Sequence, residues 1–147
     1  MCRSNCCWLK HYLTTFSLAQ IDLGGNQLCG VDRRGRGTYT AEGIRAIASA
    51  ISVSVSLTDI DLSYSNIGPV GAEHIAQAVS VSALLTSINL DGNNIRSEGA
   101  EHIAEGIAVS ASLTSIDLSW NSIGDKGVKH IAKAISVSAS LTQVLAF

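Results

Sequence analysis

Apolar and polar residues follow the same order in several segments of the chain. The segments that start at Leu57, Leu85 and Leu113 read LTDIDLSYSNIG, LTSINLDGNNIR and LTSIDLSWNSIG, and each alternates apolar and polar residues over a few positions. Such alternation is typical of a short strand with one buried face. The sequence GAEHIAQAV then places Ile75 and Val79 four residues apart, as on one face of an amphipathic helix. Each segment therefore predicts a strand followed by a helix.

The strand and helix pair recurs at a fixed interval. The steps from Leu57 to Leu85 and from Leu85 to Leu113 are both 28 residues, whereas the step from Leu18 to Leu57 is 39, which is 28 plus 11. A unit of this size cannot bury both of its apolar faces alone, so the copies must stack, with parallel strands on one side and helices on the other. The predicted domain is an α/β solenoid over 18–147, with units at 18–56 (including an 11-residue insertion at 29–39), 57–84, 85–112 and 113–140, and a partial unit at 141–147.

The pattern LxxLxLxxNxL followed by a GAxxIAxAI helix resembles the leucine-rich repeats of the ribonuclease-inhibitor type. Similar repeats occur in NOD-like receptors and in Ran GTPase-activating proteins. The resemblance covers 18–147 and recurs in register. It implies a horseshoe with a concave parallel sheet and convex helices.

The same resemblance gives a role to one polar position after each strand. Asn26, Asn93 and Asn121 occupy the place whose side chain bonds the turn backbone of neighbouring coils in this family. The second unit has Ser65 there, with Asn66 one place later. We expect weaker bonding between coils at Ser65, because a hydroxyl offers fewer hydrogen bonds than a carboxamide.

The two ends of the chain differ from the regular units. Residues 8–16, WLKHYLTTF, place their large apolar side chains on one helical face, which predicts that 1–17 form a helical cap or the remnant of a preceding unit. The last segment, LTQVLAF, supplies one strand only. Because solenoids need capping units at both ends, we expect either a fragment of a longer array or a protein that stacks with another through its last coil.

Composition narrows the class of protein further. With 147 residues, 46% of them hydrophobic, the chain can bury a continuous core, and a net charge of -2 gives no general attraction to nucleic acid. No apolar run is long enough to span a bilayer. The N-terminus lacks the features of a secretory signal, and the four cysteines do not form a secreted disulfide framework. The sequence predicts a cytoplasmic protein with free thiols.

The insertion interrupts the first unit with the sequence LCGVDRRGRGTYT, 28–40. Its spacing, Gly30-x4-Gly35, is close to that of a phosphate-binding loop. Such a loop requires Lys directly after the second glycine and Ser or Thr next, where this chain has Arg36 and Gly37. We therefore expect a flexible surface excursion from the rim of the horseshoe. The alternative is a basic loop that docks on an acidic partner or RNA through Arg33, Arg34 and Arg36.

An acidic strip is predicted on the concave face. The residue between the two inward apolar positions of each strand is polar and, in three of four units, acidic. Such a strip can attract Lys or Arg on a partner. The alternative is that a small polar residue only keeps the sheet soluble. The strip consists of Asp22, Asp61, Asn89 and Asp117, with Asp59 two places before Asp61 and Asp91 two places after Asn89.

Two aromatic residues occupy one position just beyond the strands. Tyr64 and Trp120 stand where the other units have Gly25 and Gly92. Exposed aromatics near carboxylates are typical of binding hot spots. They could instead pack on the adjacent coils that carry glycine, and the two interpretations have equal support.

No residue pattern points to catalysis or to a metal. His74, His102 and His130 recur at one helix position, but neighbouring helices lie about 8–10 Å apart, whereas zinc needs ligand atoms at about 2 Å. No nucleophile, base and orienting group form a recognisable set, and Cys29 has no histidine nearby in sequence. The sequence therefore predicts no enzyme activity, no metal and no cofactor.

These observations predict a protein-protein interaction module that binds another protein, and neither nucleic acid nor a membrane, through the concave face and the loop rim. The alternatives are GTPase activation of the Ran type, for which the arginines of the insertion are the candidate residues, and a truncated array without independent function. The predicted contact residues are Asp22, Asp59, Asp61, Tyr64, Asn89, Asp91, Asp117, Trp120, Arg33, Arg34 and Arg36.

Overall fold

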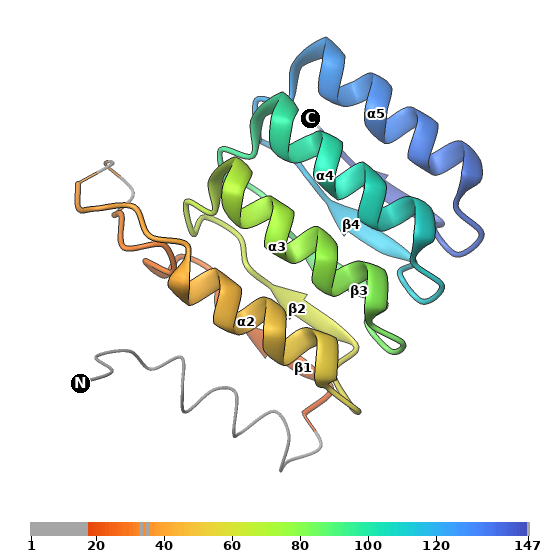
Figure 1. Cartoon of the computed structure of the whole chain (residues 1–147), viewed down its shortest axis with the longest axis horizontal. Helices are drawn as coiled ribbons and strands as arrows, with labels where there is room; N and C mark the ends of the chain where they lie inside the picture. Colours follow the sequence, from red (N-terminus) through yellow and green to blue (C-terminus); the bar gives the residue numbers. More distant parts are fainter. Residues whose placement is uncertain (1–17, 33, 35, 147) are drawn as a thin grey trace.

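The chain folds into a layer of strands covered on one side by a layer of helices (Figure 1). The computed structural model describes residues 18–32, 34 and 36–146, so the predicted cap at 1–17 and the side chain of Arg33 lie outside the described residues. The strands are β1 (Gln20–Asp22), β2 (Asp59–Asp61), β3 (Ser87–Asn89), β4 (Ser115–Asp117) and β5 (Gln143–Leu145), and the helices are α2 (Glu42–Val53), α3 (Gly68–Val81), α4 (Arg96–Val109) and α5 (Gly124–Val137).

The strands form one parallel sheet in the order β1-β2-β3-β4-β5. Ile60 pairs with Ile88, and Ile88 pairs with Ile116, which reproduces the 28-residue step, whereas Ile21 pairs with Ile60 across 39 residues. Neighbouring strands lie about 4.8 Å apart and neighbouring helices about 8–10 Å apart, so the array curves with the sheet on its concave side. The predicted α/β repeat fold is confirmed.

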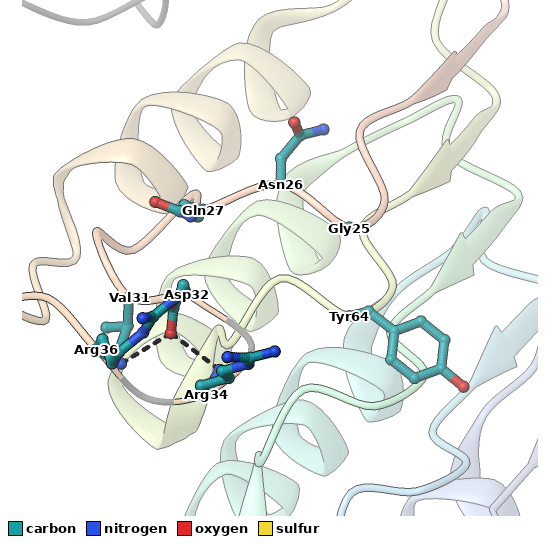
Figure 2. Close-up of a pocket in the computed structure, with 8 residues that line it drawn as sticks. All are labelled: Gly25, Asn26, Gln27, Val31, Asp32, Arg34, Arg36 and Tyr64. Atoms are coloured by element: carbon teal, nitrogen blue, oxygen red, sulfur yellow. Dashed lines mark hydrogen bonds and ion pairs between the residues drawn. The ribbon is translucent and has the colours of Figure 1, made fainter.

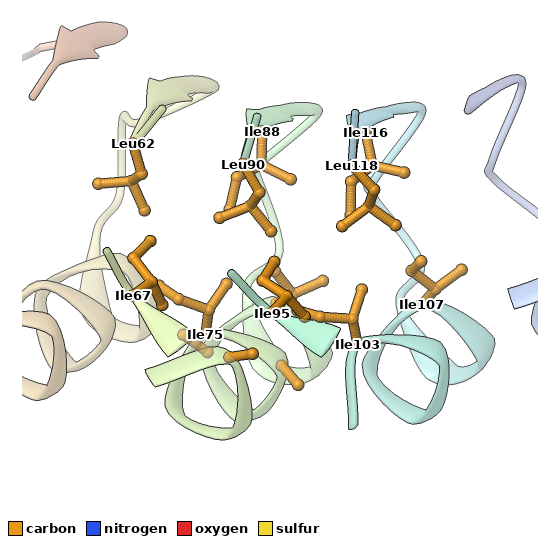
Figure 3. Packing of buried hydrophobic residues seen from close by; sticks show 14 of the residues in the cluster. Leu62, Ile67, Ile75, Ile88, Leu90, Ile95, Ile103, Ile107, Ile116 and Leu118 are labelled. Atoms are coloured by element: carbon orange, nitrogen blue, oxygen red, sulfur yellow. The ribbon is translucent and has the colours of Figure 1, made fainter. Parts of the chain in front are cut away.

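The core lies between the sheet and the helices (Figure 3). Ile88 and Leu90 of one coil point from the strand side toward Ile95 and Ile103, and all four are at most 2% exposed. Full burial of each such side chain contributes about 1.5–3 kcal/mol to folding. The second and fourth coils bury the equivalent residues, and Ile21 and Val144 of the end coils are partly buried against them, so the core runs from coil to coil.

Asparagine side chains join the coils at the turn after each strand. The Asn121 carboxamide oxygen accepts hydrogen bonds from the backbone N–H groups of Asn93 (3.0 Å) and Ile95 (3.2 Å) in the preceding coil. Its amide nitrogen donates to the carbonyl of Leu90, 2.8 Å away, and to two carbonyls of its own coil. Asn93 repeats this set of bonds one coil earlier. The role that the resemblance implied for these two residues is confirmed.

The bonding between coils is weaker where serine replaces asparagine. The Ser65 hydroxyl donates to the carbonyl of Ser63 (3.1 Å) and reaches the first coil only at Leu23, 3.4 Å away. The exposed Asn26 amide bonds to two carbonyls of its own turn, Leu23 and Gly24. The prediction of weaker bonding at Ser65 is confirmed, and the joint between the first two coils lacks the asparagine bonds of the two joints that follow it.

The helices of the described residues are short. None of them has the length and the apolar character that a crossing of a membrane requires.

Candidate partner-binding surface

The uncovered face of the sheet carries an open hollow of about 430 Å³ over β1, β2 and β3. Four of the predicted contact residues line it, namely Asp22, Asp59, Asp61 and Asn89. Three of these four side chains are carboxylates, so the hollow attracts positive charge. The remaining lining residues are Gln20, Ile21, Ile60 and Ser87.

The polar residue at the end of each strand also shapes the turn that follows. Its side-chain oxygen accepts a hydrogen bond from the backbone N–H two residues later, at 2.8–3.0 Å. Asp and Asn are favoured in such turns because their short side chains reach this N–H group. Turn formation is therefore a second alternative to a binding role for these residues, in addition to keeping the sheet soluble. The pairs are Asp22 with Gly24, Asp61 with Ser63, Asn89 with Asp91 and Asp117 with Ser119.

The carboxylates in the hollow have different internal contacts. Asp61 uses its second oxygen to accept a hydrogen bond from the Asn89 amide at 2.9 Å, and Asp59 accepts one from the Thr58 hydroxyl at 2.6 Å. For Asp22, the structure records one bond, to its own turn. Asp22 is therefore the carboxylate of this hollow with the most acceptor capacity left for a partner.

Asp91, Asp117 and Trp120 do not line the hollow. Asp117 ends β4, one coil beyond Asn89. The Asp91 carboxylate has one oxygen, Oδ1, that is buried and has no hydrogen-bond partner in the described part of the chain. An unsatisfied buried acceptor costs about 1–3 kcal/mol, and the sister coils carry Ser63 and Ser119 at this position.

The aromatic position beyond each strand has a left-handed backbone in all four coils. Its φ is 52° at Tyr64 and 54° at Trp120, compared with 69° at Gly25 and 65° at Gly92. Glycine adopts this conformation without steric cost, whereas other residues are strained in it. The two aromatic residues therefore occupy a position that the backbone suits to glycine.

The two aromatic side chains have different surroundings. A Cβ atom placed on Gly92 would lie 2.5 Å from Cε1 of the Tyr64 ring, so this ring lies directly over Gly92. This agrees with the packing interpretation for Tyr64, which is 46% exposed. Trp120 is 76% exposed. Its backbone is therefore strained while its large apolar side chain lies in contact with water.

The insertion is organised around the carboxylate of Asp32. Oδ1 accepts hydrogen bonds from the backbone N–H groups of Arg34 and Arg36, both at 2.9 Å. Oδ2 lies 2.7 Å from both Nε and Nη2 of the Arg36 guanidinium. The backbone and side-chain hydrogen bonds from Arg36 lower the pKa of Asp32 below its usual value. Asp32 thus keeps its charge near neutral pH and folds the loop onto itself.

The base of the insertion is fixed to the second coil. The Tyr39 hydroxyl donates to the carbonyl of Ile67 at 2.6 Å, and the Asn66 amide donates to the carbonyl of Asp32 at 2.8 Å. Cys29 is fully buried in the core. The expectation of a flexible excursion is therefore wrong for the base of the insertion, because these side chains tie it to the neighbouring coil.

Burial keeps the Cys29 and Tyr39 side chains protonated. Desolvation raises the pKa of the Cys29 thiol above its usual value and raises the pKa of Tyr39 to about 12. A neutral, buried thiol is a poor nucleophile, because the thiolate is the reactive form. Sequence reasoning missed Cys29, Tyr39 and Asn66 as anchors, since their contacts lie 28 to 38 residues away in the chain.

A second cavity, of about 250 Å³, opens on the rim between the insertion and the turn of the second coil (Figure 2). Arg34 and Arg36 line it from the insertion, and Tyr64 lines it from the opposite side. The structure thus places Arg34, Arg36 and Tyr64 on one cavity, whereas the sequence analysis considered the arginines and Tyr64 separately. The other lining residues are Gly25, Asn26, Gln27, Val31 and Asp32.

The repeated histidines lie on the helix side of the array. His102 Nδ1 lies 3.8 Å from the Glu105 carboxylate on the same helix. Among the residues that the structure describes, no group of three His, Cys, Asp or Glu side chains lies close enough together to hold a metal ion.

Three comparisons with known proteins bear on the fold of the chain. A family model described as Leucine Rich repeat matches 53–76, 81–104 and 109–132. A structure of leiomodin-1 actin-binding site 2 superposes with a TM-score of 0.76 at 18% identity, over 97% of this chain and 76% of that one. A tropomodulin C-terminal domain from Caenorhabditis elegans superposes with a TM-score of 0.77 at 17% identity, over 98% and 83%. No curated protein matches the chain in sequence.

Proposed function

This chain is a leucine-rich repeat protein of the ribonuclease-inhibitor type, and we propose that it is a non-enzymatic module that binds another protein on the concave face of its sheet. The observation that carries the proposal is the acidic hollow over β1, β2 and β3. None of the described helices covers this face of the sheet, because they pack on the other side (Figure 1).

The chemistry of the hollow favours a cationic side chain of the partner. Asp22, Asp59 and Asp61 line one space of about 430 Å³. A Lys or Arg that enters it forms charge-assisted hydrogen bonds, which are stronger than bonds between neutral groups. Complementary charge also speeds association and disfavours wrong partners.

Trp120 adds apolar contact area just beyond β4, at the position equivalent to Tyr64 of the rim cavity. It follows β4 and is 76% exposed. Tryptophan is enriched among the residues that contribute most to binding. A strained backbone that is retained for an exposed aromatic side chain supports a role in binding, since strain persists where function requires the residue.

The solved structure of leiomodin-1 is described as an actin-binding site, which agrees with a protein as partner. At 18% identity the likeness concerns the fold. We therefore infer only that the partner of this chain is a protein. Actin is one of the proteins to be tested as that partner.

Affinity capture with quantitative mass spectrometry tests the proposal. The wild-type protein is compared with the double variant Asp22→Asn/Asp61→Asn, whose amides keep an oxygen for the turn hydrogen bonds. Asp125→Asn, on the exposed helix side of the array, removes a charge outside the hollow. We expect a partner that the wild type and D125N capture equally and that the double variant loses at least tenfold. Equal capture by all three proteins would place the binding surface elsewhere.

A further inference from the structure

The geometry points to a second subsite in the rim cavity, where Arg34 and Gln27 bind a carboxylate of the same partner. The partner segment then carries a cation for the acidic hollow and an acidic side chain for the rim. This inference rests on the proposed function and names the charge pattern that the surface recognises.

The charges of the insertion leave one arginine available. Asp32 and Arg36 neutralise each other through two contacts of 2.7 Å. The Arg34 guanidinium lines the rim cavity and has no hydrogen-bond or ion-pair partner among the residues that the structure describes. The described part of the cavity therefore has one uncompensated positive charge, which comes from Arg34.

A neutral donor lies on the lining of the same cavity. The side-chain amide of Gln27 lines the cavity and is exposed, and within the described ranges it makes no hydrogen bond. The Asn26 amide is already used in its own turn. A guanidinium and a second N–H donor on the lining of one cavity suit a carboxylate, whose two oxygens accept several hydrogen bonds.

The backbone of Arg34 is held by hydrogen bonds before a partner binds. The backbone of Arg34 is bonded to Asp32, whose carbonyl accepts from Asn66 at 2.8 Å. Tyr39 fixes the end of the insertion at Ile67. Such prior order lowers the conformational entropy that binding costs. The anchors thus limit the movement of the backbone from which the Arg34 side chain extends into the cavity.

The rim cavity and the acidic hollow are separated by one turn. Asp22 lines the hollow and Gly25, three residues later, lines the cavity; Asp61 and Tyr64 repeat this arrangement in the second coil. Three residues span at most about 10 Å. Gly24 lies between the two sites without a side chain, and a Cβ atom there would lie 2.8 Å from Ser63 Oγ. A partner segment can therefore cross this turn with its cation and its carboxylate about three residues apart.

Three synthetic peptides separate the two subsites. The first has the sequence GGKGGEGG with blocked ends, the second has Gln in place of its Glu, and the third has Met in place of its Lys. Amide shifts of Asp22, Gly24 and Gln27 in two-dimensional NMR titrations of the full chain give each affinity. We expect the Glu peptide to bind about threefold tighter than the Gln peptide, as for an exposed ion pair. We also expect the Met peptide to bind most weakly.

The variants assign the effect to Arg34. Arg34→Ala should make the Glu and Gln peptides bind equally and leave the preference for Lys over Met unchanged. Arg45→Glu, an exposed site on α2, should keep the threefold ratio. Equal affinity of wild type for the Glu and Gln peptides, or a threefold ratio retained in R34A, overturns the carboxylate subsite alone. Loss of the Lys preference in wild type, or no shift with any peptide, overturns the cation site and the carboxylate subsite together.

Discussion

The joint between the first two coils and the two joints that follow it are held by different side chains. Asn93 and Asn121 each bridge to the preceding coil through three buried hydrogen bonds. Ser65 makes one such contact, at 3.4 Å. There the Tyr39 hydroxyl and the Asn66 amide make the bonds between coils instead. The insertion thus replaces part of the asparagine bonding at the place where serine weakens it.

The largest loss of stability is expected when an asparagine that joins two coils is replaced. Asn93→Ala removes five hydrogen bonds and leaves the N–H groups of Ser65 and Ile67 buried without an acceptor. Because unsatisfied buried groups cost about 1–3 kcal/mol each, the free energy of unfolding should fall by about 3 kcal/mol. Urea denaturation measures it. Asn26→Ala, at the equivalent exposed position, should cost less than about 0.5 kcal/mol, and equal losses would contradict the comparison.

The second-largest loss of stability is expected at the joint between the first two coils, which the insertion helps to hold together. Tyr39→Phe keeps the ring and removes the hydroxyl that donates to Ile67. The loss should be about 1–1.5 kcal/mol and should be confined to the first two coils. Hydrogen exchange is the measurement, because Leu23 N–H bonds to Asp61 across this joint whereas Leu90 N–H bonds to Asp117 across a regular one. Faster exchange at Leu23 with unchanged exchange at Leu90 is expected. Equal acceleration at both would show that Tyr39 does not act locally.

These two joints indicate how far the sequence predicts the fold. The 28-residue step fixes strand register and core positions, because equivalent residues such as Ile60 and Ile88 pair in neighbouring strands. It also predicts the roles of Asn93 and Asn121. It gives no information on the insertion, which has no counterpart in the other units. The contact of Tyr39 with Ile67 depends on how an unrepeated segment folds back on the array.

The candidate site likewise has one part that the repeat pattern predicts and one part that it does not predict. The register placed the carboxylates of β1 and β2 on one face, where Asp22, Asp59 and Asp61 line one hollow. Arg34, Gln27 and Tyr64 line one cavity because of the path of the insertion, which the repeat pattern does not predict. The turn-forming role of the strand-end carboxylates was also missed, although Asp and Asn before a turn indicate it.

A gain in stability is expected at Asp91, where the third coil differs in sequence from the two coils beside it. Asp91→Ser introduces the residue found in two neighbouring coils and removes the buried carboxylate oxygen that has no partner in the described chain. The free energy of unfolding should rise by about 1 kcal/mol. Thermal unfolding followed by circular dichroism should show a Tm higher by a few degrees. Ser63→Asp is the reverse exchange in the second coil, and a stabilising effect there would contradict this explanation.

The smallest effect concerns the two aromatic residues with left-handed backbones. Trp120→Gly relieves strain of about 1 kcal/mol, part of which is offset by the flexibility of glycine in the unfolded chain. The net gain should be about 0.5 kcal/mol in urea denaturation. Tyr64→Gly relieves similar strain but loses the packing over Gly92, so it should be neutral or destabilising. A loss for W120G as large as that for Y64G would mean that Trp120 also packs on its neighbours.

Site-specific photo-crosslinking tests most directly the claim that the concave face binds a protein. A benzophenone amino acid is placed at Ser87 in the acidic hollow or, as control, at Val81 on the exposed end of α3. Irradiation of each purified protein in cell extract should yield one dominant adduct from position 87 and none of that mass from position 81. The adduct should disappear when Asp22 and Asp61 are both changed to Asn. The same adduct from position 81, or its persistence in the double variant, would contradict binding on the concave face.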